Sequence, residues 1–119
     1  MIHNKWPDKP IVVSEFGAGA IKGLSGDKLY TAGFGAKRDY TEAYQAYLCK
    51  VQLAHILNKK DFVVGTAPWI LADFRDISKP YRPLADLDVK GLLTYDRQKK
   101  MAYNTVASAY KQIQKDYEQ

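Results

Sequence analysis

The stretch "IVVSEFGAG", residues 11–19, decides the fold class of this chain. Three β-branched apolar residues open it, one acid, Glu15, stands near its middle, and two glycines follow. Because no polar residue interrupts the run before Ser14, the pattern is typical of a strand buried on both faces, as in a parallel sheet. Loops converge at the carboxyl ends of parallel strands, so a carboxylate placed there is a candidate for chemistry.

A second strand and two helices complete the expected order. The stretch "DFVVGTAPW", residues 61–69, predicts another buried strand. Thr41 is the expected N-cap of a helix between the two strands. The apolar stripe predicted for that helix is Tyr44, Tyr47, Leu48, Val51 and His55. A last helix over residues 98–117 has the predicted stripe Ala102, Val106, Ala109, Ile113 and Tyr117. Two consecutive βα units of a parallel α/β sheet follow from this order.

The segments 18–40 and 75–90 are predicted to be long irregular loops, because glycines crowd the first and prolines interrupt the second. Two strands alone rarely make a stable sheet, since both edges stay unpaired. A complete (βα)₈ barrel takes ~250 residues, so two βα units would supply about a quarter of one. We therefore expect the missing strands to come from the rest of a longer polypeptide or from other copies of the chain, and we expect self-association.

Composition excludes several classes of function. The 119 residues carry a net charge of +5, but the lysines and arginines are dispersed, which disfavours nucleic-acid binding. No apolar run of about 18 residues could span a membrane, so the chain is expected to be soluble. The start "MIHNKWPDKP" lacks the apolar region of a signal peptide, and it could equally be internal to a longer protein. Cys49 is the one cysteine, so there is no internal disulfide and no cysteine pair for a metal.

Glu15 and Trp69 both fall at predicted strand ends. A carboxylate in that position can attack an electrophilic carbon or accept a proton, and an indole can stack on the apolar face of a sugar ring. The alternative is that Glu15 is a solvated acid at the start of a loop and that Trp69 caps the core. Spacing alone does not separate the two interpretations.

Four stretches together resemble the last portion of the catalytic barrel of family 2 glycoside hydrolases, the group of β-galactosidases, β-glucuronidases and β-mannosidases. They stand in the order of that family: "KPIVVSEFGAGAIKGL", "YTEAYQAYLCKVQ", "DFVVGTAPWILADFRD" and "KGLLTYDRQKKMAY". The resemblance covers roughly residues 9–112. It implies a partial TIM barrel consisting of about the last two βα units, strands 7 and 8 with their helices.

The resemblance implies that Glu15 is the nucleophile of a retaining glycosidase. Retaining hydrolysis uses two carboxyl groups about 5–5.5 Å apart, one as nucleophile and one as acid and base. In the family the second is a glutamate of an Asn-Glu pair at the end of the fourth strand, and it has no counterpart in these 119 residues. We therefore expect the segment to be inactive by itself.

The same resemblance assigns sugar contacts. Trp69 corresponds to the sugar platform of the family, although Ile70 and Leu71 replace its Asn and Phe. Lys90 corresponds to the lysine of an Asn-x-Lys motif that reads the substrate carboxylate in β-glucuronidases, but Asp88 stands in place of the Asn. Because Asp88 would repel a uronate, this departure favours a neutral sugar such as galactose.

Asp73, Arg97 and Lys100 are expected to have structural roles. Asp73 is expected to cap a turn or to pair with Arg75 rather than to contact substrate. Arg97 and Lys100 are expected to anchor the final helix.

Two hypotheses remain open on the sequence. In the first, the chain belongs to a β-galactosidase-like enzyme that needs no cofactor, with a carbohydrate as substrate and with no metal site, nucleic acid or membrane involved. In the second, it is a free-standing, non-catalytic domain derived from such a barrel that binds carbohydrate or protein.

Overall fold

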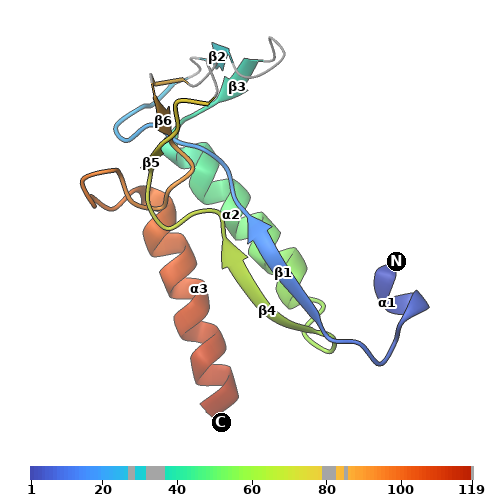
Figure 1. Cartoon of the computed structure of the whole chain (residues 1–119). Helices are drawn as coiled ribbons and strands as arrows, with labels where there is room; N and C mark the ends of the chain where they lie inside the picture. Colours follow the sequence, from blue (N-terminus) through green and yellow to red (C-terminus); the bar gives the residue numbers. More distant parts are fainter. Residues whose placement is uncertain (27–28, 32–36, 79–82, 85, 119) are drawn as a thin grey trace.

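A computed structural model describes residues 1–26, 29–31, 37–78, 83–84 and 86–118. Gly33, Gly35 and Pro80, which contribute to the prediction of irregular loops, lie outside these ranges. The chain is organised around two parallel strands, β1 (Ile11–Phe16) and β4 (Val63–Pro68), and two long helices, α2 (Glu42–Leu57) and α3 (Met101–Glu118) (Figure 1). The predicted order of strand, helix, strand, helix is confirmed.

The register of the parallel pair brings the carboxyl ends of the strands together. Ile11 lies opposite Val63 at one end and Phe16 lies opposite Pro68 at the other. The N-terminal ends of α2 and α3 lie at the same end of the molecule as these carboxyl ends (Figure 1). This is the arrangement in which parallel α/β folds place their functional loops.

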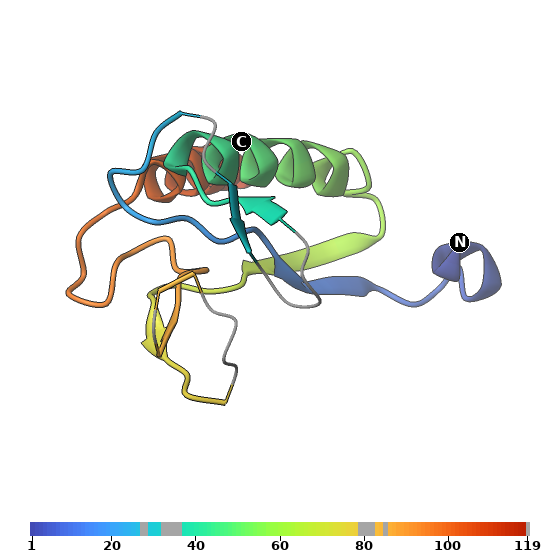
Figure 2. The ribbon, with the colours of Figure 1, turned by 90° about the horizontal axis from the view of Figure 1, so that it is seen from above.

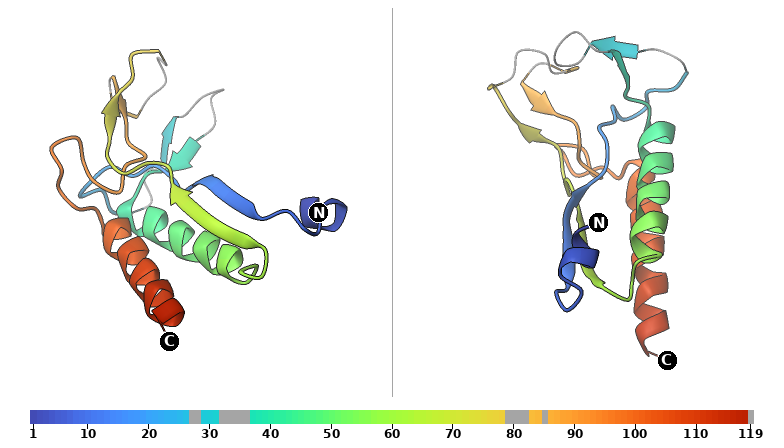
Figure 3. Two further views of the ribbon diagram at one scale, coloured as in Figure 1. Left: turned by 60° about the horizontal axis from the view of Figure 1, so that its bottom comes forward. Right: turned by 90° about the vertical axis from the view of Figure 1, so that its right-hand side faces the viewer.

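Both long helices lie on one side of the strand pair and pack against each other (Figures 1 and 3). Their contact and the strand face beneath them form the core, which consists of Phe16, Cys49, Leu53, Leu92, Ala102 and Val106. The other face is open: Val12 is 62% exposed and Val64 is 64% exposed. The prediction of strands buried on both faces is therefore wrong for this chain, because no described element covers that second face.

The buried face of α2 also differs from the prediction. Gln45, Cys49 and Leu53 are buried, whereas Tyr47 is 64% exposed and His55 is exposed. Gln45 and Cys49 each follow a predicted residue, Tyr44 and Leu48, by one position, which is a rotation of about 100° around the helix axis. Tyrosine is compatible with either a buried or a solvated face, so the tyrosines led to the wrong choice of buried face. In α3 the prediction holds at Ala102 and Val106, which are buried, and fails at Tyr117, which is 77% exposed.

The start of α2 follows its sequence signal. Thr41 is the N-cap, and its hydroxyl oxygen accepts a hydrogen bond from the amide of Tyr44 at 3.1 Å. Glu42, in the first turn, connects α2 to other parts of the chain. Its carboxylate accepts hydrogen bonds from the amides of Gly23 and Met101, at 2.8 and 2.9 Å. Met101 is the first residue of α3, so one acid joins the starts of both helices to the loop after β1.

The two segments predicted to be irregular contain short antiparallel pairs. In the first, β2 (Leu29–Thr31) pairs with β3 (Lys37–Asp39), and in the second, β5 (Phe74–Arg75) pairs with β6 (Leu87–Asp88). These strands of two or three residues are too short to produce an alternating apolar pattern, which is why the sequence did not reveal them. A short N-terminal helix, α1 (Ile2–Lys5), lies at the outer end of the strand pair, away from the two long helices (Figure 2), and its His3 ring stacks on that of Phe62 with centroids 3.9 Å apart.

The single thiol provides a direct test of the core. Cys49 is 1% exposed, and burial raises the pKa of its thiol above the ordinary value. Because thiolate is the reactive form, we expect alkylation by iodoacetamide at pH 8 to be at least about 100-fold slower in the native chain than in urea. Mass spectrometry over time measures both rates. Equal rates would contradict the burial of this helix face.

Candidate active site at the carboxyl ends of the parallel strands

Glu15 and Trp69 are brought together by the pairing of the strands that carry them. The amide of Trp69 donates a hydrogen bond of 2.7 Å to the carbonyl oxygen of Phe16, the residue after Glu15. Glu15 is exposed, and none of the described residues donates a hydrogen bond to its carboxylate. Trp69 is 39% exposed, and its ring meets that of Phe74 edge-on, with centroids 6.4 Å apart. The Trp69–Ile70 peptide bond is cis.

Gly17 allows the chain to turn directly after the strand. Its φ of 127° lies in the region that favours glycine, and a Cβ built there would lie 3.2 Å from the carbonyl oxygen of Trp69. Its amide donates to the side-chain oxygen of Gln52 at 2.9 Å. The turn after Glu15 is thus fixed on one side by the second strand and on the other by α2.

Lys90 lies beside the same strand end. The amide of Ile70 donates to the carbonyl oxygen of Lys90 at 3.1 Å, so the Lys90 backbone is adjacent to that of Trp69 and Ile70. Lys90 is half-buried, whereas Asp88 is only 2% exposed, and the Asp88 carboxylate accepts a hydrogen bond of 3.0 Å from the Lys90 amide. The backbones of the three residues selected from the sequence therefore converge at one end of the strand pair.

Asp73 and Lys100 form a buried ion pair with an oxygen-to-nitrogen distance of 2.8 Å. Burial raises the pKa of the Asp73 carboxyl and lowers the pKa of the Lys100 ammonium, because burial penalises each charged form, while the pairing opposes both shifts. The structural role expected of Asp73 is confirmed, but its partner is Lys100 and not Arg75. Lys100 precedes Met101 and ties the start of α3 to the loops, as expected of an anchor.

Two glutamines of α2 were missed by the sequence reasoning. Gln45 is fully buried, and its amide group donates to the carbonyl oxygens of Ala18 and Gly91, at 2.8 and 3.0 Å. Gln52, seven residues further along the same helix face, holds the amide of Gly17. A polar residue repeated at seven-residue spacing beside Cys49 was the available signal, but the tyrosines of the same helix obscured it.

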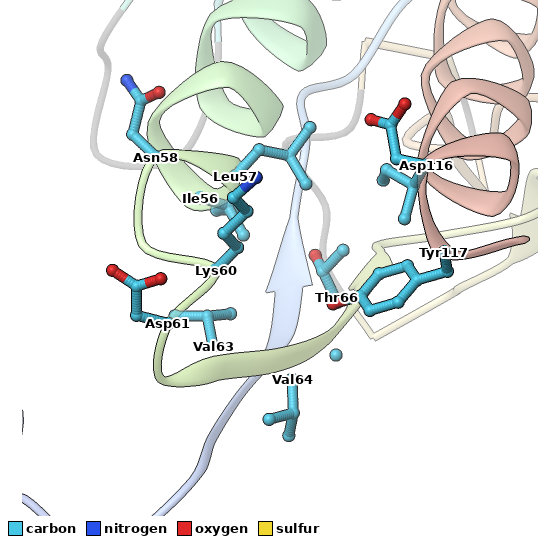
Figure 4. A pocket seen from close by; sticks show the side chains of 12 residues that line it. Ile56, Leu57, Asn58, Lys60, Asp61, Val63, Val64, Thr66, Asp116 and Tyr117 are labelled. Carbon is cyan, nitrogen blue, oxygen red and sulfur yellow. The ribbon is translucent and has the colours of Figure 1, made fainter. Parts of the chain in front are cut away.

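A separate hollow lies at the opposite end of β4 (Figure 4). It is bounded by the end of α2, the first residues of β4 and the last turns of α3, and Leu57, Val63 and Tyr117 are among its lining residues. Glu15 and Trp69 are not part of it. This hollow is thus away from the carboxyl ends of the strands, where Glu15 and Trp69 are both exposed.

The described ranges contain no group of three or more His, Cys, Asp or Glu side chains that could hold a metal ion. None of the helices in the described part of the chain is both long and apolar enough to cross a bilayer.

Comparison with known proteins identifies the family. Residues 1–115 match the family model "Glycosyl hydrolases family 2, TIM barrel domain". The β-glucuronidase of Rattus norvegicus is 32% identical over 112 residues, which is 92% of this chain and 15% of that enzyme. The β-glucuronidase of Paenibacillus borealis is 30% identical over 102 residues, 86% of this chain and 15% of that enzyme. The chain therefore spans about one seventh of the length of these curated relatives.

Solved structures agree with the sequence comparison. A β-glucuronidase of Dictyoglomus thermophilum superposes with a TM-score of 0.68 at 33% identity, over 92% of this chain and 17% of that one. A β-galacturonidase of Eisenbergiella tayi bound to galacturonate gives a TM-score of 0.67 at 30% identity, over 87% and 17%. The chain belongs to the glycosyl hydrolase family 2 TIM-barrel domain.

Proposed function

We propose that the chain forms the last two βα units of a retaining β-glycosidase barrel and supplies the nucleophile, Glu15. The observation that carries this proposal is the position of an exposed carboxylate, with no partner among the described residues, at the carboxyl end of a parallel strand. Trp69 directly follows the neighbouring strand. Membership of a family of glycosidases supports it.

The chemistry assigned to these residues follows from retaining hydrolysis. The Glu15 carboxylate attacks the anomeric carbon, forming a glycosyl ester as the bond to the leaving oxygen breaks. A second carboxyl group protonates that oxygen and then removes a proton from the water that cleaves the ester. This second carboxyl comes from outside the 119 residues, so the isolated chain is inactive. The indole of Trp69 stacks on the sugar and orients it for attack.

The substrate proposed here is a β-uronide. The argument for a neutral sugar required Asp88 to repel a uronate, but Asp88 is 2% exposed and its carboxylate holds the amide of Lys90. Burial lowers the pKa of the Lys100 ammonium, and the nearby negative charge of Asp88 is one of the charges that oppose this shift, so Asp88 also interacts with a buried cation. Lys90 is the more accessible charge, and the relatives named above are β-glucuronidases and a β-galacturonidase.

A chimera tests the proposal. In the β-glucuronidase of Paenibacillus borealis, the segment that matches this chain is replaced by the chain itself, so that the recipient supplies the acid and base. We expect the chimera to hydrolyse 4-nitrophenyl β-D-glucuronide, whereas the recipient without the segment and the isolated chain do not. A folded chimera with no hydrolase activity on glycosides would contradict the proposal and would favour a non-catalytic binding domain.

Lys90 determines the choice of sugar in this account. In the chimera, Lys90→Met removes the charge that pairs with the substrate carboxylate and is expected to lower kcat/KM for the glucuronide by about 100-fold, within the range for loss of a buried charged partner. Hydrolysis of 4-nitrophenyl β-D-galactoside, whose sugar is neutral, serves as the control and should change less than about threefold. If the wild-type chimera prefers the galactoside, the neutral-sugar interpretation is correct instead.

We also propose that the isolated chain self-associates. The edges of β1 and β4 are unpaired among the described residues, and Val12 and Val64 expose an apolar face. Size-exclusion chromatography with light scattering should show a mass above the 13.5 kDa of one chain, decreasing on dilution. A monomer at high micromolar concentration would contradict this.

A further inference from the structure

Lys100 contacts each of the three loops that carry the candidate site. Its ammonium donates to the carbonyl oxygen of Ala20 at 2.7 Å, to the carboxylate of Asp73 at 2.8 Å and to the carbonyl oxygen of Val89 at 3.0 Å. An ammonium has three donors, and all three are used. The side chain is fully buried, so the geometry of these bonds is fixed by packing.

The three acceptors have a specific relation to the candidate residues. Ala20 lies on the loop that follows Glu15, Asp73 lies on the segment that follows Trp69, and Val89 directly precedes Lys90. Backbone contacts reinforce the connection, because the amide of Ala20 donates to the carbonyl oxygen of Val89 at 2.9 Å. The buried ammonium of Lys100 therefore joins the three loops that follow or precede the candidate residues.

We propose that Lys100 is a positioning residue that holds the loops of Glu15, Trp69 and Lys90 in the arrangement needed for hydrolysis. This inference rests on the proposed function of those three residues. Lys100 does not itself touch the sugar in this account, since it is fully buried. Gln45 acts beside it, because its amide group joins Ala18 of the first loop to Gly91 of the third.

Loss of Lys100 alone would leave Asp73 as an uncompensated buried charge, and the protein could fail to fold. The informative variant therefore combines Lys100→Met with Asp73→Asn. Asparagine keeps an oxygen to accept the hydrogen bond that the Gly91 amide donates to Asp73, at 2.8 Å, while the connection to Ala20 and Val89 is removed. Lys99→Met is the matched control, because Lys99 is the neighbouring lysine and its side chain is exposed.

The first measurement uses the chain itself and requires no activity. Hydrogen exchange of the Ala20 amide is compared with that of Val106 in the core of α3. In the double variant we expect the protection of Ala20 to fall by at least about tenfold relative to Val106, as local opening becomes easier. The Lys99→Met control should exchange like the wild type. Unchanged relative protection of Ala20 in the double variant would overturn the proposal, even if the chimera proves inactive.

The second measurement is the turnover per functional site in the chimera. Sites are counted by titration with a fluorinated glycoside, and kcat is expressed per titrated site. Because small misplacements of reacting groups cost about 100-fold in rate, we expect the double variant to lose about that factor in kcat per site. A merely structural role would reduce the number of sites and leave kcat per site unchanged, and that result would also overturn the proposal.

Discussion

Replacement of Glu15 by glutamine is expected to lower kcat of the chimera for its glycoside by about four orders of magnitude or more, equivalent to at least ~5.5 kcal/mol of transition-state stabilisation. Glutamine has nearly the same shape but can neither form the glycosyl ester nor place a negative charge beside the anomeric carbon. Initial rates at saturating 4-nitrophenyl β-D-glucuronide measure the loss.

The structure supplies two controls for this result. Glu15 is exposed and holds no described partner, so its replacement should leave the urea midpoint of unfolding unchanged. Glu118→Gln, at the exposed end of α3, makes the same chemical change away from the strand ends and should retain full activity. A Glu15→Gln chimera with more than about a tenth of wild-type kcat would remove the nucleophilic role from this residue.

Gly91→Ala is expected to produce the largest loss of stability. A Cβ at Gly91 would overlap with the amide nitrogen of Asp73 and the carbonyl oxygen of Leu93, and neither backbone atom can move without breaking the hydrogen bond that joins those two residues. We expect a decrease of more than ~3 kcal/mol in the free energy of unfolding, measured by urea denaturation followed by circular dichroism.

Gly65→Ala is the matched control for that substitution. A Cβ at Gly65 would meet the methyl groups of Val12 at 3.6 Å, an ordinary contact, so the free energy of unfolding should change by less than about 1 kcal/mol. Equal effects of the two substitutions would contradict the tight packing of the Lys90–Gly91 turn against the segment after Trp69.

The features predicted correctly from the sequence are those with a local cause. β-branched runs produced β1 and β4, and the hydroxyl of Thr41 capped α2 as its position indicated. The parallel pairing followed from the helix between the two strands, because such a crossover returns the chain in the same direction. These signals lie within a few residues of the structure that they specify.

The features that were missed depend on contacts across long separations in sequence. The partner of Asp73 is 27 residues away, at Lys100, and no spacing rule connects the two. The side chain of Gln45 donates a hydrogen bond to Gly91, 46 residues further along the chain. That bond explains why α2 buries a face with a polar residue instead of the predicted face with the tyrosines. Glu15 and Trp69 were selected by their position at predicted strand ends, and the resemblance added Lys90 and the role of each residue. The structure adds the adjacency of the three at the backbone level.

The same distinction applies to the substrate. Asp88 appears in the sequence as a charge next to Lys90, and a charge near a binding site suggests repulsion of an anion. Its burial and its bond to the Lys90 amide are tertiary facts. Because a buried Asp88 that accepts a hydrogen bond from the Lys90 amide is not available to repel an anion, the expected ligand changes from a neutral sugar to a uronide.

Covalent trapping tests the central claim most directly. The chimera is incubated with a 2-deoxy-2-fluoro-β-glucuronyl fluoride, digested with protease and analysed by tandem mass spectrometry. The account predicts one glycosyl adduct per active chimera, on the peptide "IVVSEFGAG" at Glu15, and no adduct on the isolated 119-residue chain. An adduct on another carboxylate of the chimera, or labelling of Glu15 in the isolated chain, would contradict it.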